Sequence, residues 1–262
     1  MRTDLRRLAV ALFTACVLIS CRGGEAPLPR RIVDLSPPLT PDLDLRRLGS
    51  RALHFLGTEG RILTSPVLPS RAELAYGIST IALLSHSGSH VDAPARLLRG
   101  GDHPAQISLD RLVGPACLVD LRWHDRHTEL QISDLELTHI SAGDVVLLFL
   151  GYEPPFGDKW PQYAPLSRQA AEWLAAKRIR ALATDIPTIV SYETLEARLR
   201  NHQPPEEAWA EYLPLMQAQI PIISGLVNLD AIVGEQHIVF AGLPLPLSDA
   251  TGAPLRAVAL IY

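Results

Sequence analysis

Short, unbroken apolar runs recur along this chain, and they restrict its fold more than any other feature. Residues 144–150, for example, read Asp-Val-Val-Leu-Leu-Phe-Leu, with no polar side chain after the first. A strand with one side in water alternates apolar and polar residues, whereas a strand covered on both faces stays apolar. Such runs and the turn residues around them predict strands at residues 31–36, 79–86, 116–122, 144–150, 180–184, 237–241 and 256–262.

Helices are predicted between the later strands. Ser167 can cap a helix over residues 168–177, and Ser191 can cap a second one that ends before Pro204. A third helix is expected at about residues 206–217, and short strands with irregular loops are expected at residues 45–75. Strands interleaved with helices in this order indicate an α/β fold.

The composition fits one sizeable domain and excludes one class of partner. The chain has 262 residues, of which 47% are hydrophobic and 20% are charged. Its formal net charge is −4 and no basic stripe with interleaved aromatic residues is present, so we expect no nucleic-acid partner.

The N-terminus has the pattern of an export signal. Arg2, Arg6 and Arg7 precede an apolar run over residues 8–19, which is shorter than the roughly 20 residues of a membrane-spanning helix. The run ends in Leu-Ile-Ser-Cys21, which resembles a bacterial lipobox. We therefore expect a lipoprotein signal peptide at residues 1–20, a tether at 21–30 with lipid on Cys21, and a folded domain at 31–262. The protein would be exported and held on the periplasmic or cell-surface side of a bacterial membrane by that lipid alone. A plain signal peptide and an uncut anchor are the alternatives.

A cluster of metal-ligating residue types follows the predicted strand at residues 79–86. His86, His90 and Asp92 lie within seven residues, in the sequence His-Ser-Gly-Ser-His-Val-Asp-Ala-Pro. Two imidazoles and a carboxylate are a common set of ligands for zinc, manganese or iron(II), and they leave positions open for water and substrate. The alternative is that both histidines form hydrogen bonds in a turn and that Asp92 caps the segment after it.

Several segments in order along residues 31–262 resemble one known family. They are Asp34-Leu-Ser36, the His86–Pro94 segment, residues 143–148, Thr184-Asp-Ile-Pro-Thr188, residues 220–230 and the C-terminal Gly252-Ala-Pro-Leu-Arg-Ala. The chain thus resembles the metal-dependent cyclase/hydrolase superfamily, which includes bacterial kynurenine formamidase and isatin hydrolase. The resemblance implies a mixed, partly barrel-like β-sheet with flanking helices, a metal on His86, His90 and Asp92, and an oligomer, which we expect to be a homodimer.

Three positions depart from the family's usual pattern. The family motif HxGTHxDAPxH ends in a histidine that is proposed to shuttle protons, and that position is Arg96 here. A later histidine and glutamate of the family correspond to Tyr212 and Ser224. An arginine stays protonated near neutral pH, so Arg96 cannot act as a base, but it can clamp a carboxylate or stabilise an oxyanion. We therefore expect a single zinc or manganese ion, with water or Tyr212 completing its coordination shell.

Further residues are candidates for catalysis or for substrate binding. His103 lies in a Gly-Gly-Asp-His-Pro loop and is a candidate replacement base. Trp160 is a candidate for an aromatic wall of the substrate pocket, or it packs in an ordinary loop. Tyr212 and Ser224 are candidate substrate-binding residues.

Two functions from different classes follow. The first is an exported metal-dependent hydrolase of a small amide, lactam or lactone, in which a metal activates water and polarises the scissile carbonyl. The second is a catalytically degenerate, lipid-anchored binding protein on the same fold, which would hold a small anionic ligand or a metal without turnover.

Overall fold

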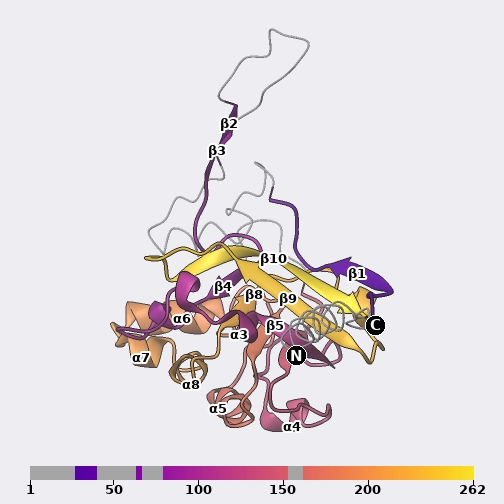
Figure 1. Ribbon diagram of the computed structural model, residues 1–262. Coiled ribbons are helices and arrows are strands. Elements are labelled where there is room, and N and C mark those ends of the chain that lie inside the picture. Colours follow the sequence, from indigo (N-terminus) through magenta and orange to yellow (C-terminus); the bar gives the residue numbers. More distant parts are fainter. Residues whose placement is uncertain (1–26, 40–62, 67–78, 153–161) are drawn as a thin grey trace, which may run out of the picture.

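The protein folds around a closed, mixed β-barrel. The structure is a computed structural model that describes residues 27–39, 63–66, 79–152 and 162–262. Its main sheet has the strand order β1-β10-β4-β8-β7-β6-β5-β9, and β9 also pairs with β10. This last pairing closes seven strands into a barrel, and β1 lies outside it on β10 (Figure 1). The expected mixed, barrel-like α/β fold is confirmed.

The elements have the following bounds. The strands are β1 (Arg31–Asp34), β2 (Leu63–Pro66), β3 (Ser79–Ala82), β4 (His90–Asp92), β5 (Val113–Asp120), β6 (Val145–Phe149), β7 (Ala181–Thr184), β8 (Ile222–Ser224), β9 (Ile238–Pro244) and β10 (Gly252–Ile261). The helices are η2 (Pro94–Arg96), η3 (Pro104–Gln106), α3 (Leu109–Leu112), α4 (Ile132–Leu135), α5 (Arg168–Ala176), α6 (Tyr192–Arg200), α7 (Pro205–Ala208), α8 (Leu213–Gln217) and η4 (Leu229–Ile232). None of the helices in the described ranges has both the length and the apolar character that a membrane crossing requires.

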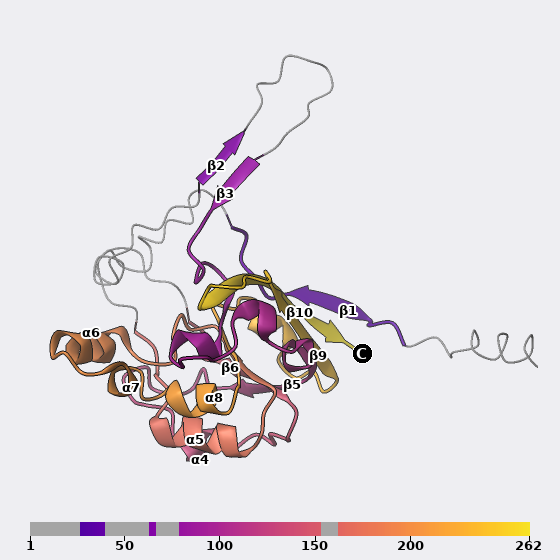
Figure 2. The ribbon, with the colours of Figure 1, turned by 60° about the vertical axis from the view of Figure 1, so that its left-hand side comes forward.

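The unbroken apolar runs of β6 and β7 are buried on both faces, as predicted. Strands β5, β6, β7 and β8 run parallel to one another. Along β6, Leu147 packs inside the barrel, whereas Leu148 packs outside it against a layer that includes Leu174 of α5 and Leu215 of α8. Figures 1 and 2 show these helices gathered on one side of the barrel. A strand between two apolar layers needs no polar face, which explains the continuous runs.

The first two predicted helices form, and the third is interrupted. The Ser167 hydroxyl accepts a hydrogen bond from the Ala170 backbone N–H at the start of α5, and Ser191 caps α6 in the same way through Thr194. The helix expected at residues 206–217 is divided into α7 and α8. Pro214 has no N–H to continue the helical hydrogen bonds, so the chain turns between the two short helices.

The strand predicted at residues 79–86 is wrong in length and in burial. Strand β3 stops at Ala82, pairs with no described strand other than β2, and leaves Ile81 65% exposed. Figure 2 shows this two-stranded ribbon projecting from the barrel on the side away from the helices. Of the segment 45–75, β2 alone lies inside the described residues. The barrel strands β4 and β8 were not predicted, because three residues are too few to show a periodicity.

Candidate metal centre

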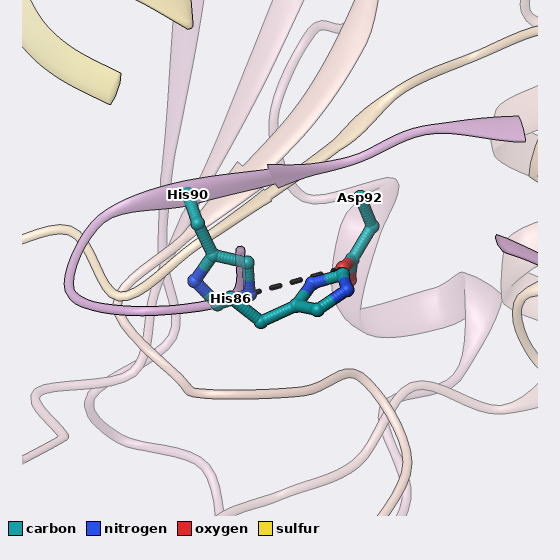
Figure 3. Close-up of side chains that lie close together, drawn as sticks. All are labelled: His86, His90 and Asp92. Atoms are coloured by element: carbon teal, nitrogen blue, oxygen red, sulfur yellow. Dashed lines mark ion pairs between the residues drawn. The ribbon is translucent and has the colours of Figure 1, made fainter. Parts of the chain in front are cut away.

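The three candidate ligands meet on the outer face of the barrel, under the helical layer. His90 and Asp92 are the two ends of β4 and therefore share one face, whereas Val91 between them points into the barrel core. His86 reaches the same point from the turn before β4 (Figure 3). The cluster was expected to follow the strand predicted at residues 79–86. His86 does follow a strand, β3, whereas His90 and Asp92 are themselves part of a strand.

The ligand atoms of the three residues lie within 4.8 Å of one another. His86 Nδ1 is 2.7 Å from Asp92 Oδ1, and His90 Nε2 is 3.8 Å from the same oxygen. Gly252, opposite Asp92 on β10, makes this approach possible, because a Cβ at that position would lie 2.4 Å from the His86 ring. The short spacing in sequence therefore becomes a compact donor set in space.

His90 is held in the form that a metal needs. Its Nδ1 donates a hydrogen bond to the Gly88 carbonyl at 2.9 Å, so the lone pair is on Nε2, which faces Asp92. Burial in the apolar surroundings of β4 lowers the pKa of His90 to about 4. The imidazole is therefore neutral near pH 7, as coordination requires.

Asp92 is a fully buried carboxylate that uses only one of its two oxygens in hydrogen bonds to the described residues. Burial by itself raises the pKa of Asp92, but Arg96 and the two histidines outweigh burial and hold this pKa well below its usual range. Oδ1 accepts from Arg96 and His86, whereas Oδ2 is buried and has no hydrogen-bond partner among the described residues. A buried acceptor without a donor is costly unless something else binds it. An ionised, unsatisfied oxygen beside two imidazoles fits a divalent cation.

Arg96 is part of the same cluster. Its Nη1 donates to Asp92 Oδ1 and lies 3.3 Å from His86 Nδ1. Its guanidinium carbon is 4.6 Å from the centre of the Trp209 ring and 5.4 Å from that of the Tyr212 ring. The cation is thus bound by a carboxylate on one side and by aromatic faces on another.

Tyr212 and Ser224 also border the cluster. The Tyr212 hydroxyl shares a hydrogen bond of 2.8 Å with Thr188, and burial raises the pKa of this phenol well above its usual value. Ser224 lies directly opposite His90 on β8, and its buried hydroxyl makes no hydrogen bond to any described residue. Both side chains are therefore placed to contact a ligand bound at the three candidate metal ligands.

Sequence comparisons show the family of the chain. A family profile described as "Putative cyclase" matches residues 33–189. The chain belongs to this family. It is 26% identical over 230 residues to a kynurenine formamidase of Erythrobacter litoralis, covering 87% of this chain and 93% of the relative. It is 30% identical over 181 residues to a kynurenine formamidase of Maricaulis maris, covering 69% and 79%.

Solved structures share the cyclase-family fold. Isatin hydrolase A from Ralstonia solanacearum superposes with a TM-score of 0.68 at 19% identity, covering 100% of this chain and 98% of that one. Isatin hydrolase A from Labrenzia aggregata, bound to benzyl benzoate, has a TM-score of 0.65 at 22% identity, covering 88% and 93%. At these identities the likeness establishes the fold alone.

Of the remaining predicted residues of this cyclase-family chain, the structure describes His103. His103 caps η3, and its Nδ1 donates to the Ala250 carbonyl at 2.8 Å. No hydrogen bond or ion pair joins its ring to the three ligands in the described ranges. Its assignment as a replacement base stays a prediction. Trp160 and Cys21 lie outside the described residues.

Two residues at the centre of this cyclase-family site were not predicted. Thr251 meets His86 Nε2 at 3.1 Å, and Trp209 stacks on Arg96. Trp209 lies three residues before Tyr212, and residues three apart share a helix face, so the predicted helix could have indicated it. Thr251 carried no such signal, because the pairing of β10 with β4, which are far apart in sequence, brings it to His86.

Proposed function

We propose that this protein is a metal-dependent hydrolase of a small amide, lactam or lactone. The observation that carries the proposal is the buried His86, His90 and Asp92 cluster with an unsatisfied carboxylate oxygen. Support comes from the family, whose relatives include proteins named kynurenine formamidase and isatin hydrolase. A single zinc or manganese ion fits three such ligands.

The side chains of the site would have separate roles in hydrolysis. Asp92 and the two histidines would hold the cation. When held there, a cation would act as a Lewis acid toward a carbonyl and would provide an activated water near neutral pH. Arg96, always protonated, would stabilise negative charge as it develops on the carbonyl oxygen, while Tyr212 and Ser224 would contact the substrate.

The reaction adds water to the carbonyl carbon and breaks the bond to nitrogen or oxygen, and the departing atom takes a proton. Arg96 cannot exchange this proton near pH 7. The absence of a general acid or base typically costs about 10²–10⁴-fold in rate. We therefore propose that lactones and activated esters, whose leaving groups need less protonation, react faster than unactivated amides.

A panel of N-formyl aryl amines, cyclic imides and lactones tests the proposal. The full chain is assayed with added zinc or manganese, beside the His86→Ala/His90→Ala variant and a chelator-treated sample. Metal-dependent turnover that the variant lacks would support the proposal. No turnover of any member, with metal demonstrably bound, would contradict it.

The binding-protein alternative is favoured by one observation, the ion pair between Arg96 and Asp92. This pair satisfies one carboxylate oxygen without any metal. On this alternative, a small carboxylate binds the site in a calorimeter, and no substrate in the panel is turned over.

We further propose that the protein is exported and lipid-anchored through Cys21 and that it forms a homodimer. The basic start, the apolar run and the cysteine after it support the anchor. Labelling of the expressed protein with a radioactive fatty acid, lost in Cys21→Ala, tests the anchor, and light scattering of the detergent-solubilised protein tests the dimer.

A further inference from the structure

Two donors already occupy one oxygen of the candidate metal ligand Asp92. Oδ1 accepts from Arg96 Nη1 and lies 2.7 Å from His86 Nδ1. Since a carboxylate cannot donate, His86 must supply the proton between Nδ1 and Oδ1. The charge of Asp92 is therefore neutralised by this chain's own residues in the absence of a metal.

Arg96 is fixed at this point by more than one contact. Its side chain is 19% exposed, and its backbone N–H donates to the Ala93 carbonyl in the turn of η2. The rings of Trp209 and Tyr212 flank the guanidinium. Within the described ranges, Asp92 is the only carboxylate that forms an ion pair with it. A cation buried to this degree depends on its one counter-ion.

A divalent cation would need the same counter-ion. With neutral imidazoles, the cluster carries one negative charge on Asp92 and one positive charge on Arg96, and its net charge is zero. A divalent metal would raise this net charge to +2. Like charges at contact distance repel strongly where water is scarce. A metal would therefore bind either against the electrostatic repulsion of the guanidinium or after the guanidinium has been displaced from Asp92.

We propose that Arg96 is an intramolecular competitor of the metal for Asp92. The guanidinium lowers the metal affinity of this chain below the affinity that His86, His90 and Asp92 alone would provide. This inference rests on the proposed function, in that both place the metal on these three ligands, and it adds a residue that regulates occupancy of the site.

The zinc affinity of charge-removing variants tests this competition. Arg96→Met keeps an apolar stem against Trp209 and removes the charge. The matched control is Arg122→Met, because Arg122 also pairs with a nearby aspartate, Asp120, and stacks on a ring, that of Phe149, at 4.8 Å. The dissociation constant of the full chain for zinc is measured by competition with a chromophoric chelator at pH 7.5.

We expect Arg96→Met to bind zinc at least about tenfold more tightly than the wild type, because a contacting positive charge is removed. Arg122→Met should stay within about twofold of the wild type, because its charge lies outside the cluster. Unchanged or weaker zinc binding by a folded Arg96→Met protein would overturn the inference. Circular dichroism checks folding, and Arg96→Gln, which keeps a neutral donor for Asp92, replaces the methionine variant if that variant does not fold.

The outcomes separate this inference from the proposed function. Tighter zinc binding by the variant without turnover of any substrate would support the competition and contradict the hydrolase. Metal-dependent turnover, with equal zinc affinities in the wild type and Arg96→Met, would support the hydrolase and contradict the competition. No zinc binding by wild type or variants up to about 1 mM zinc would contradict both.

Discussion

The Asp92→Asn substitution tests how far the ion pair with Arg96 holds this region together. The change keeps the size of the side chain and removes its charge. Asp92 is fully buried, and the substitution removes the one carboxylate that pairs with Arg96 in the part of the chain that the structure describes. The affected quantity is the free energy of unfolding of the metal-free protein.

The structure sets the expected magnitude. Removing one partner of a buried ion pair typically costs about 3–5 kcal/mol. The lower end of this range, about 3 kcal/mol, applies here, because Arg96 keeps 19% exposure and both ring contacts. Replacing both partners, as in Asp92→Asn/Arg96→Met, leaves no uncompensated charge, and its cost should fall to about 1 kcal/mol.

Urea unfolding of the four proteins of this double-mutant cycle, in the presence of a chelator, measures these energies. The chelator ensures that metal binding does not contribute. We expect the double variant to be more stable than Asp92→Asn alone. If the double variant costs as much as the two single variants together, the two residues are not coupled and the reasoning is refuted.

Three further predictions concern regions outside the metal centre. Burial raises the pKa of the half-buried Cys117 thiol to about 11, so its thiolate is scarce at pH 8. The rate of its alkylation by iodoacetamide, followed by mass spectrometry, should therefore rise up to about pH 11, and a rate that levels off near pH 8.5 would contradict this. Glu211→Gln breaks the bidentate pair with Arg198 and should lower stability by about 2–3 kcal/mol in urea unfolding, whereas no change would mean that the pair is not essential. Ser167→Ala removes the cap of α5 and should cost about 1 kcal/mol, with Ser167→Asp retaining most of the stability.

The sequence predicted the barrel strands that are long enough to carry a pattern. The run at β6 is apolar throughout because Leu147 faces the barrel core and Leu148 faces the helices. Strands β4 and β8 have three residues each and escaped detection, although they carry His90, Asp92 and Ser224. Their formation depends on tertiary pairing with β10 and β7, which no local pattern reports.

The candidate site was predictable where its residues are near in sequence. His86, His90 and Asp92 share one short segment, and the resemblance to a family added Arg96, Tyr212 and Ser224. The ion pair between Arg96 and Asp92 was not predicted, although the two residues are four apart. A clamp on a substrate carboxylate was expected of Arg96, yet the structure places its guanidinium on a carboxylate of the chain itself.

The most direct test of the account is the amount of metal that the chain binds. Equilibrium dialysis of the full chain against zinc or manganese, followed by elemental analysis, keeps the free metal fixed and so detects weak binding. We predict about one metal per chain at saturation, and less than about a tenth of that for His86→Ala/His90→Ala. Wild-type protein that binds no more metal than this double variant would contradict the account.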